Sequence, residues 1–182
     1  MHADIQEILL SESQIRDRIA QLGRELKRDY GDKNPIFVGV LKGVVVFFAD
    51  MIRAFDAPCQ LDFMWLSSYS GVESTGNVQL RNGISADLTG RHVVILEDIL
   101  DTGRSLTFVR DKLLSYGAAS VKICTLLDKP EGRAEGFSIT ADYIGFTIPN
   151  AFVVGFGLDY NEQYRNLPYV GILKPEVYKK KE

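Results

Sequence analysis

The most constraining feature of this sequence is an unbroken apolar run that leads directly into acidic residues. The run extends from Val93 to Leu96, and Glu97, Asp98 and Asp101 follow it. A continuous apolar run is typical of a strand that is buried on both faces of a parallel sheet. Open α/β sheets bind their ligands at the carboxyl ends of such strands. The sequence therefore predicts an α/β fold whose functional edge carries these acids.

The turn that follows has the composition of a phosphate site, and it comprises Asp101, Thr102, Gly103, Arg104 and Ser105. It offers two hydroxyls, a glycine that permits close approach to the backbone, and the free N–H groups of a helix start. Acids also cap helices, because they are favoured at helix N-termini. Three acids so close together, however, repel one another unless a cation or sugar hydroxyls are present. The pattern favours a sugar phosphate bound with a divalent metal.

Strands and helices alternate along the rest of the chain. Ser11 and Gln14 have the spacing of a capping box, and the apolar period that follows predicts a helix ending near Tyr30. Further helices are predicted at 44–55 and 104–116, and strands at 35–41, 61–66, 78–81, 92–97, 121–127, 143–146, 152–156 and 170–173. This alternation indicates a twisted, mainly parallel sheet flanked by helices. A single domain is expected over residues 1–182.

Composition narrows the class of protein. The chain has 182 residues with 46% hydrophobic content, which is enough for a full core. Cys59 and Cys124 cannot form a disulfide framework, and no N-terminal apolar segment resembles a signal peptide or membrane span, so a cytoplasmic protein without a membrane partner is expected. A net charge of −3 argues against nucleic acid as a partner. With His2 and His92 as its two histidines, the chain also lacks the residues for His-based triads or His-rich metal sites.

The segment from Val93 to Leu106 resembles the phosphoribosyl pyrophosphate (PRPP) motif of type I phosphoribosyltransferases. From about Leu9 to Leu173 the chain is most similar to bacterial hypoxanthine-guanine phosphoribosyltransferases. The resemblance implies the type I fold, with a flexible lid loop and a small hood formed by the termini. It also implies a purine salvage enzyme that transfers the phosphoribosyl group of PRPP to N9 of hypoxanthine or guanine. The products would be IMP or GMP and pyrophosphate. The resemblance further implies Mg²⁺ as the cofactor and a homodimer or homotetramer as the assembly.

The resemblance assigns the PRPP site residue by residue. Asp101 is the expected general base, and Leu41-Lys42-Gly43 is the expected pyrophosphate loop, commonly with a cis peptide before the lysine. Without the resemblance, Lys-Gly after a strand is usually only a loop. PRPP contacts are expected from Leu41, Lys42, Gly43, Glu97, Asp98, Asp101, Thr102, Gly103, Arg104, Ser105 and Arg165. The expected metal ligands are Glu97, Asp98 and Asp159, and the sequence does not separate metal binding from ribose binding for the first two.

The resemblance also assigns a purine site and a lid. Lys129 follows a predicted strand, and its ammonium can only donate, which suits the 6-oxo group of a purine. Phe152 is expected to stack on the ring, although the residue type alone would more often be core. The remaining expected purine contacts are the backbone of Val153 and the side chain of Asp159, and the lid is expected to include Ser68 and Tyr69.

Two alternatives stay open from the sequence. A xanthine-preferring phosphoribosyltransferase would share every motif, because the sequence does not resolve contacts to the purine 2-position. A nucleic-acid-binding regulator of the same fold that senses PRPP is disfavoured by the acidic balance of the chain.

Overall fold

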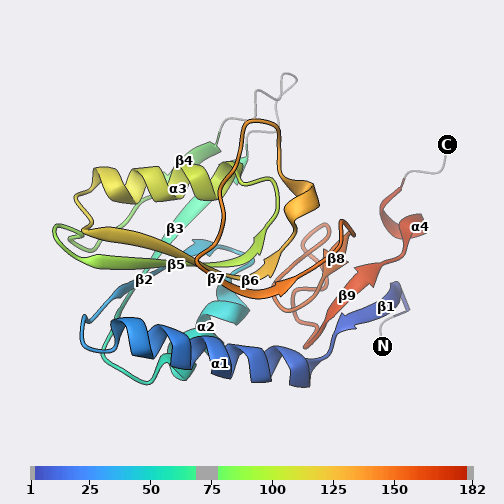
Figure 1. Cartoon of the computed structure of the whole chain (residues 1–182). Helices are drawn as coiled ribbons and strands as arrows, with labels where there is room; N and C mark the ends of the chain where they lie inside the picture. The colour runs from blue at the N-terminus through green and yellow to red at the C-terminus, as the bar shows by residue number, and fades with distance from the viewer. Residues whose placement is uncertain (1–2, 69–77, 180–182) are drawn as a thin grey trace.

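The computed structural model describes residues 3–68 and 78–179, and these form a mixed α/β structure (Figure 1). Its central sheet has the strand order β4-β3-β2-β5-β6-β7. Strand β4 is antiparallel to β3, and the other neighbours are parallel. The strands are β2 (Ile36–Leu41), β3 (Gln60–Ser68), β4 (Val78–Asn82), β5 (His92–Leu100), β6 (Ser120–Asp128) and β7 (Tyr143–Thr147). The predicted twisted, mainly parallel sheet is confirmed.

Helices cover both faces of this sheet. Helices α1 (Glu12–Tyr30) and α2 (Val45–Phe55) lie on one face and α3 (Arg104–Ser115) on the other (Figure 1). The capping box predicted at Ser11 is present, and the apolar period of α1 becomes its buried face. The central strands β2 and β5 are covered on both sides, in keeping with the apolar runs Ile36–Leu41 and 93–96. No helix in the described ranges is both long and apolar enough to cross a membrane.

A smaller antiparallel sheet beside the main one unites segments from both ends of the chain (Figure 1). It has the order β1-β9-β8, with β1 at Ile5–Leu10, β9 at Val170–Leu173 and β8 at Val153–Val154. The short helix α4 (Pro175–Tyr178) follows β9 directly. This sheet is the hood implied by the resemblance. The sequence did not reveal β1, because Ile5 and Leu10 are its buried residues and those between are mostly exposed, without strict alternation.

Several strands extend one or two residues beyond the predicted bounds, and two strands differ more. The strand expected at 152–156 is shorter, because Gly155 and Phe156 adopt φ values of 98° and 50°, which end the extended conformation. Strand β5 is longer than expected, because its pairing with β6 continues to Leu100 opposite Asp128. As a result, Glu97 and Asp98 lie within a buried strand and not beyond its end.

Candidate active site

Three segments meet closely at the carboxyl end of the sheet. A Cβ atom at Gly43 would lie 1.9 Å from Oδ2 of Asp98, and one at Gly157 would lie 2.0 Å from the carbonyl oxygen of Gly43. No larger residue fits either position without movement of its neighbours. The Leu41–Lys42 peptide is cis, as the resemblance implied. The loop after β2, the acids of β5 and the segment at Gly157 therefore form one packed unit.

Asp98 is a buried carboxyl group, and Glu97 beside it is half-buried. Burial first, and the neighbouring Asp98 carboxylate second, raise the pKa of Glu97 well above its ordinary value. Burial also raises the pKa of Asp98, opposed in part by hydrogen bonds and by the positive charge of Arg165. Oε2 of Glu97 is buried and has no hydrogen-bond partner among the atoms that the structure describes. The strand thus holds an acceptor that a hydroxyl or a cation would satisfy.

The predicted phosphate turn lines a small cavity. Its volume is about 110 Å³, and its lining combines the end of β5 with the start of α3: Glu97, Ile99, Leu100, Asp101, Thr102, Gly103, Ser105 and Leu106. Gly103 precedes α3 with φ 82°, a conformation that glycine adopts without steric cost. Arg104 does not line this cavity, and its guanidinium lies over the Phe137 ring, 5.8 Å from the centroid.

Lys129 and Asp101 form an ion pair at the carboxyl end of the sheet. Nζ of Lys129 lies 2.8 Å from Oδ2 of Asp101, and the lysine side chain is only 12% exposed. The contact follows from the parallel pairing of β5 with β6, which aligns Leu100 with Asp128. A Cβ at Gly132 would lie 2.0 Å from Oδ1 of Asp101. Sequence reasoning missed this glycine, whose importance depends on a neighbour far away in the chain.

Phe152 is 38% exposed at the edge of the hood. The Tyr178 ring of α4 lies parallel to it at a centroid distance of 4.7 Å, and the Tyr160 ring meets it edge-on at 5.6 Å. Val153 is buried and pairs with Ile172 of β9. The two tyrosines were not predicted from the sequence, because α4 and the turn containing Tyr160 reach Phe152 only through the hood.

Arg165 organises the segment that carries Asp159. Nη2 of Arg165 lies 2.9 Å from Oδ1 of Asp159, and Nη1 donates to the carbonyl of Gly157 at 2.8 Å. Lys42 reaches the same segment by donating to Glu162 at 3.2 Å. This hydrogen bond and the lysine charge lower the pKa of Glu162. The two cations predicted for pyrophosphate, Lys42 and Arg165, therefore share one corner of the site.

The backbone of this segment is strained. Phe156, Asn161, Glu162 and Tyr164 all have positive φ values, between 50° and 75°. Side chains other than glycine adopt this region at a cost of about 1 to 3 kcal/mol each, and such residues cluster at functional sites. Hydrogen bonds across the segment hold it, including those from the N–H of Phe156 to Leu167 and from the N–H of Gly157 to Arg165.

The predicted metal ligands are not gathered into a cluster. Within residues 3–68 and 78–179, no three His, Cys, Asp or Glu side chains are arranged to hold a metal ion. Asp159 is engaged with Arg165, and its Oδ2 accepts a hydrogen bond from the N–H of Glu162. Of the expected lid, the structure gives the backbone of Ser68 at the end of β3, while Tyr69 lies outside the described residues.

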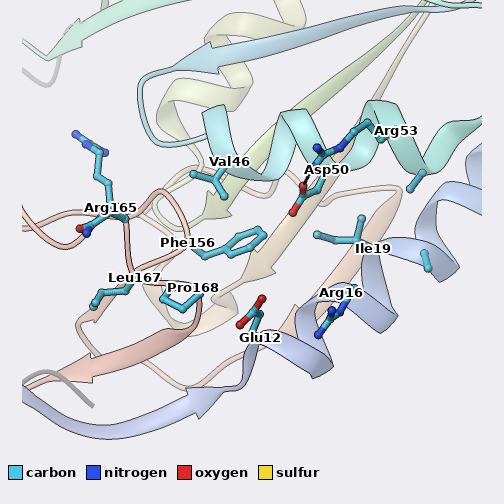
Figure 2. Close-up of a pocket in the computed structure, with 13 residues that line it drawn as sticks. Glu12, Arg16, Ile19, Val46, Asp50, Arg53, Phe156, Arg165, Leu167 and Pro168 are labelled. Carbon is cyan, nitrogen blue, oxygen red and sulfur yellow. Dashed lines mark hydrogen bonds and ion pairs between the residues drawn. The ribbon is translucent and has the colours of Figure 1, made fainter.

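A larger cavity of about 560 Å³ lies behind the Asp159 segment, between α1, α2 and residues 156–168 (Figure 2). Its lining is mostly apolar and includes Phe156, Leu167 and Pro168. Arg165 borders it, but its guanidinium points away from the cavity (Figure 2). This cavity therefore lies on the opposite side of the segment from the polar groups described above.

Comparison with known proteins identifies the family. Residues 5–161 match the family model of the phosphoribosyl transferase domain. The chain therefore belongs to the phosphoribosyltransferase family, within its hypoxanthine-guanine group. It is 51% identical to the hypoxanthine-guanine phosphoribosyltransferase of Streptococcus pneumoniae strain R6, over 96% of this chain and 97% of that protein.

Two further relatives extend this result. The hypoxanthine phosphoribosyltransferase of Staphylococcus aureus has a crystal structure that superposes with a TM-score of 0.93 at 46% identity, covering 99% of this chain and 97% of that one. The bifunctional protein TilS/HprT of Listeria innocua is 51% identical over 98% of this chain. The chain spans about a quarter of the length of that protein (27%).

Proposed function

We propose that the protein is a hypoxanthine-guanine phosphoribosyltransferase of purine salvage. It transfers the 5-phosphoribosyl group of PRPP to N9 of hypoxanthine or guanine and releases pyrophosphate with IMP or GMP. The contact of Lys129 with Asp101 carries this proposal, because it joins a donor for the 6-oxo group to an acid beside the phosphate turn. The comparisons do not favour the xanthine-preferring enzyme or the nucleic-acid-binding regulator.

The cavity at the start of α3 suits the 5-phosphate of PRPP. Thr102 and Ser105 supply hydroxyls there, and the helix start supplies N–H groups and a partial positive charge. The ribose hydroxyls would donate to Glu97 and Asp98, which satisfies the free oxygen of Glu97. The pyrophosphate would lie in the corner of Lys42 and Arg165 and replace their present carboxylate partners.

Bond formation follows from this placement. The purine stacks on Phe152 while its 6-oxo group accepts a hydrogen bond from Lys129. N9 attacks C1 of the ribose as the bond to pyrophosphate breaks, through a transition state with oxocarbenium character. Asp101 accepts the proton that the purine loses from N7. Its negative charge also stabilises the positive charge that develops on the ring. The two cations stabilise the charge on the leaving pyrophosphate.

Mg²⁺ is proposed as the cofactor. Mg²⁺ usually binds through one or two carboxylates together with substrate phosphates and water, so a preformed cage of three acids is unnecessary. The unpartnered oxygen of Glu97, with Asp98 and Asp159, provides oxygen donors of this kind. The ion would neutralise pyrophosphate charge. Calorimetry should show weak PRPP binding in excess chelator, and equal affinity with and without Mg²⁺ would contradict the proposal.

The deciding experiment measures kcat/KM for hypoxanthine, guanine, xanthine and adenine with PRPP and Mg²⁺. Lysine cannot accept from the adenine amino group, and an unpaired buried donor is costly, so oxopurines should exceed adenine at least about 10²-fold. Lys129→Ala should remove much of this preference, whereas Phe152→Ala should lower kcat/KM for all purines by a similar factor.

Lys122→Ala provides the matched control, because Lys122 also pairs with an aspartate, Asp142 at 2.7 Å, but on the surface. Equal use of adenine and hypoxanthine by the wild type would refute the base site. A homodimer or homotetramer in the cytoplasm stays a prediction, and light scattering of the purified protein tests the assembly.

A further inference from the structure

Arg133 is a buried cation at the carboxyl end of the sheet, and the reaction described above does not use it. Its side chain is 16% exposed and forms an ion pair with Asp128. The guanidinium also donates to four backbone carbonyls: those of Leu100 at 2.7 Å, Asp101 at 2.7 Å, Lys129 at 3.0 Å and Ile139 at 3.3 Å. One planar group therefore connects the ends of β5 and β6.

Three of the four carbonyls that Arg133 binds belong to Asp101 and Lys129, the two residues of the base site, or to Leu100, which precedes Asp101. Nη1 bonds both Asp101 and Lys129, and it also bonds Leu100, whose carbonyl accepts the N–H of Lys129 at 3.0 Å. A single nitrogen atom thus links the backbone of the acid directly to that of the lysine, in addition to the pairing of β5 with β6. A guanidinium suits this task because its donors are held in a rigid plane.

We propose that Arg133 is a positioning residue that holds Asp101 and Lys129 at the spacing required for both proton transfer and recognition of the 6-oxo group. This inference rests on the proposed function. A displacement of reacting groups by about 1 Å can cost about 10²-fold in rate, so the loss of such a link would be visible in kinetics. Asp128 balances the buried charge, while the carbonyl bonds set the geometry.

Arg18 offers a matched control in the same chain. It also donates to two consecutive backbone carbonyls, of Ile144 at 2.7 Å and Gly145 at 3.1 Å, and pairs with Glu25 at 2.8 Å. Its side chain is 23% exposed, and its contacts join α1 to β7, away from the base site. Arg18→Lys should therefore lower the melting temperature much as Arg133→Lys does, without its kinetic consequences.

The experiment compares Arg133→Lys with Arg18→Lys in the assay of hypoxanthine and adenine. Arg133→Lys should lower kcat by about 10- to 100-fold and reduce the hypoxanthine-to-adenine preference by about tenfold. Guanidinium ion below its denaturing range should restore part of the kcat of Arg133→Ala. A preference ratio equal to that of Arg18→Lys, together with no rescue, would overturn the inference.

Asp128→Asn tests the positioning role of Arg133 if the Arg133 variants do not fold. Under the proposal, this variant retains the four carbonyl bonds and hence the wild-type base preference, although its stability falls. Loss of the preference in Asp128→Asn would show that the charge pair sets the geometry and would refute the role of the carbonyl bonds. If the wild type did not transfer the phosphoribosyl group to any purine, the proposed function itself would be refuted.

Discussion

Asp62 and Glu97 are both carboxylates of the central sheet, but their surroundings are opposite. Oδ2 of Asp62 accepts hydrogen bonds from the N–H groups of Ser85 and Ala86, both at 2.8 Å, and Oδ1 accepts one from the N–H of Phe63 at 2.7 Å. Burial would raise the pKa of Asp62, but these bonds outweigh it and lower the pKa. Glu97 has an oxygen without a partner, and its pKa is raised.

This difference in hydrogen bonding distinguishes an acid that stabilises the fold, Asp62, from an acid of the candidate active site, Glu97. Asp62 uses its charge to join β3 to the segment before β5, so its ionised form stabilises the native state. Glu97 keeps acceptor capacity for a ligand, so its ionised form destabilises the ligand-free protein. Functional sites commonly reduce stability in this way. Mutations at the two kinds of acid should therefore act in opposite directions on stability, and only those in the site should act on turnover.

The largest effect is expected at Asp101. Asp101→Asn keeps the shape of the side chain but removes the proposed general base, so turnover should fall by about 10²-fold or more. Steady-state kinetics of IMP formation measures this change. Asp62→Asn is the control, and its turnover should equal that of the wild type. Near-normal turnover would remove Asp101 from the role of base.

A smaller effect is expected when the scaffold acid is changed. Asp62→Asn should lower the free energy of unfolding by about 1 to 3 kcal/mol at neutral pH, because hydrogen bonds to a charged acceptor are lost or weakened. The lowered pKa means that the ionised group stabilises the protein above its ordinary pKa of 3.8 and ceases to do so as the pH falls through the folded pKa. Urea titrations should therefore show the difference shrinking in acid, and a constant difference would contradict this account.

The smallest effect, with the opposite sign, is expected at Glu97. Glu97→Gln should raise the free energy of unfolding of the ligand-free protein by about 1 kcal/mol at neutral pH, because the Glu97 carboxyl group ionises more favourably in the unfolded chain than beside Asp98 in the folded protein. The raised pKa means that the wild type loses stability as the pH rises from 4.5, the ordinary value, toward the folded pKa. The variant should lack this slope in denaturant titrations. Lower stability of Glu97→Gln at pH 7 would break the comparison with Asp62.

Local sequence signals predicted most of the fold, because each depends on neighbouring residues. The apolar period of α1 and its capping box at Ser11 required no knowledge of the rest of the chain. The unbroken run at 93–96 specified a strand buried on both faces. Strand β1 and helix α4 were missed, because the hood is stabilised by pairing between the two ends of the chain. The assignment of one domain to residues 1–182 stays a prediction.

The sequence by itself determined the chemistry that this protein carries: acids after a buried strand, a phosphate turn, and a lysine after the neighbouring strand. Tertiary structure decided which groups meet. The pairing of β5 with β6 places Lys129 2.8 Å from Asp101. The fold of 129–133 onto the end of β5 gives Gly132 and Arg133 their importance. Such contacts join residues distant in the chain, and local propensity carries no information about them because their energy comes from packing and hydrogen bonds across elements.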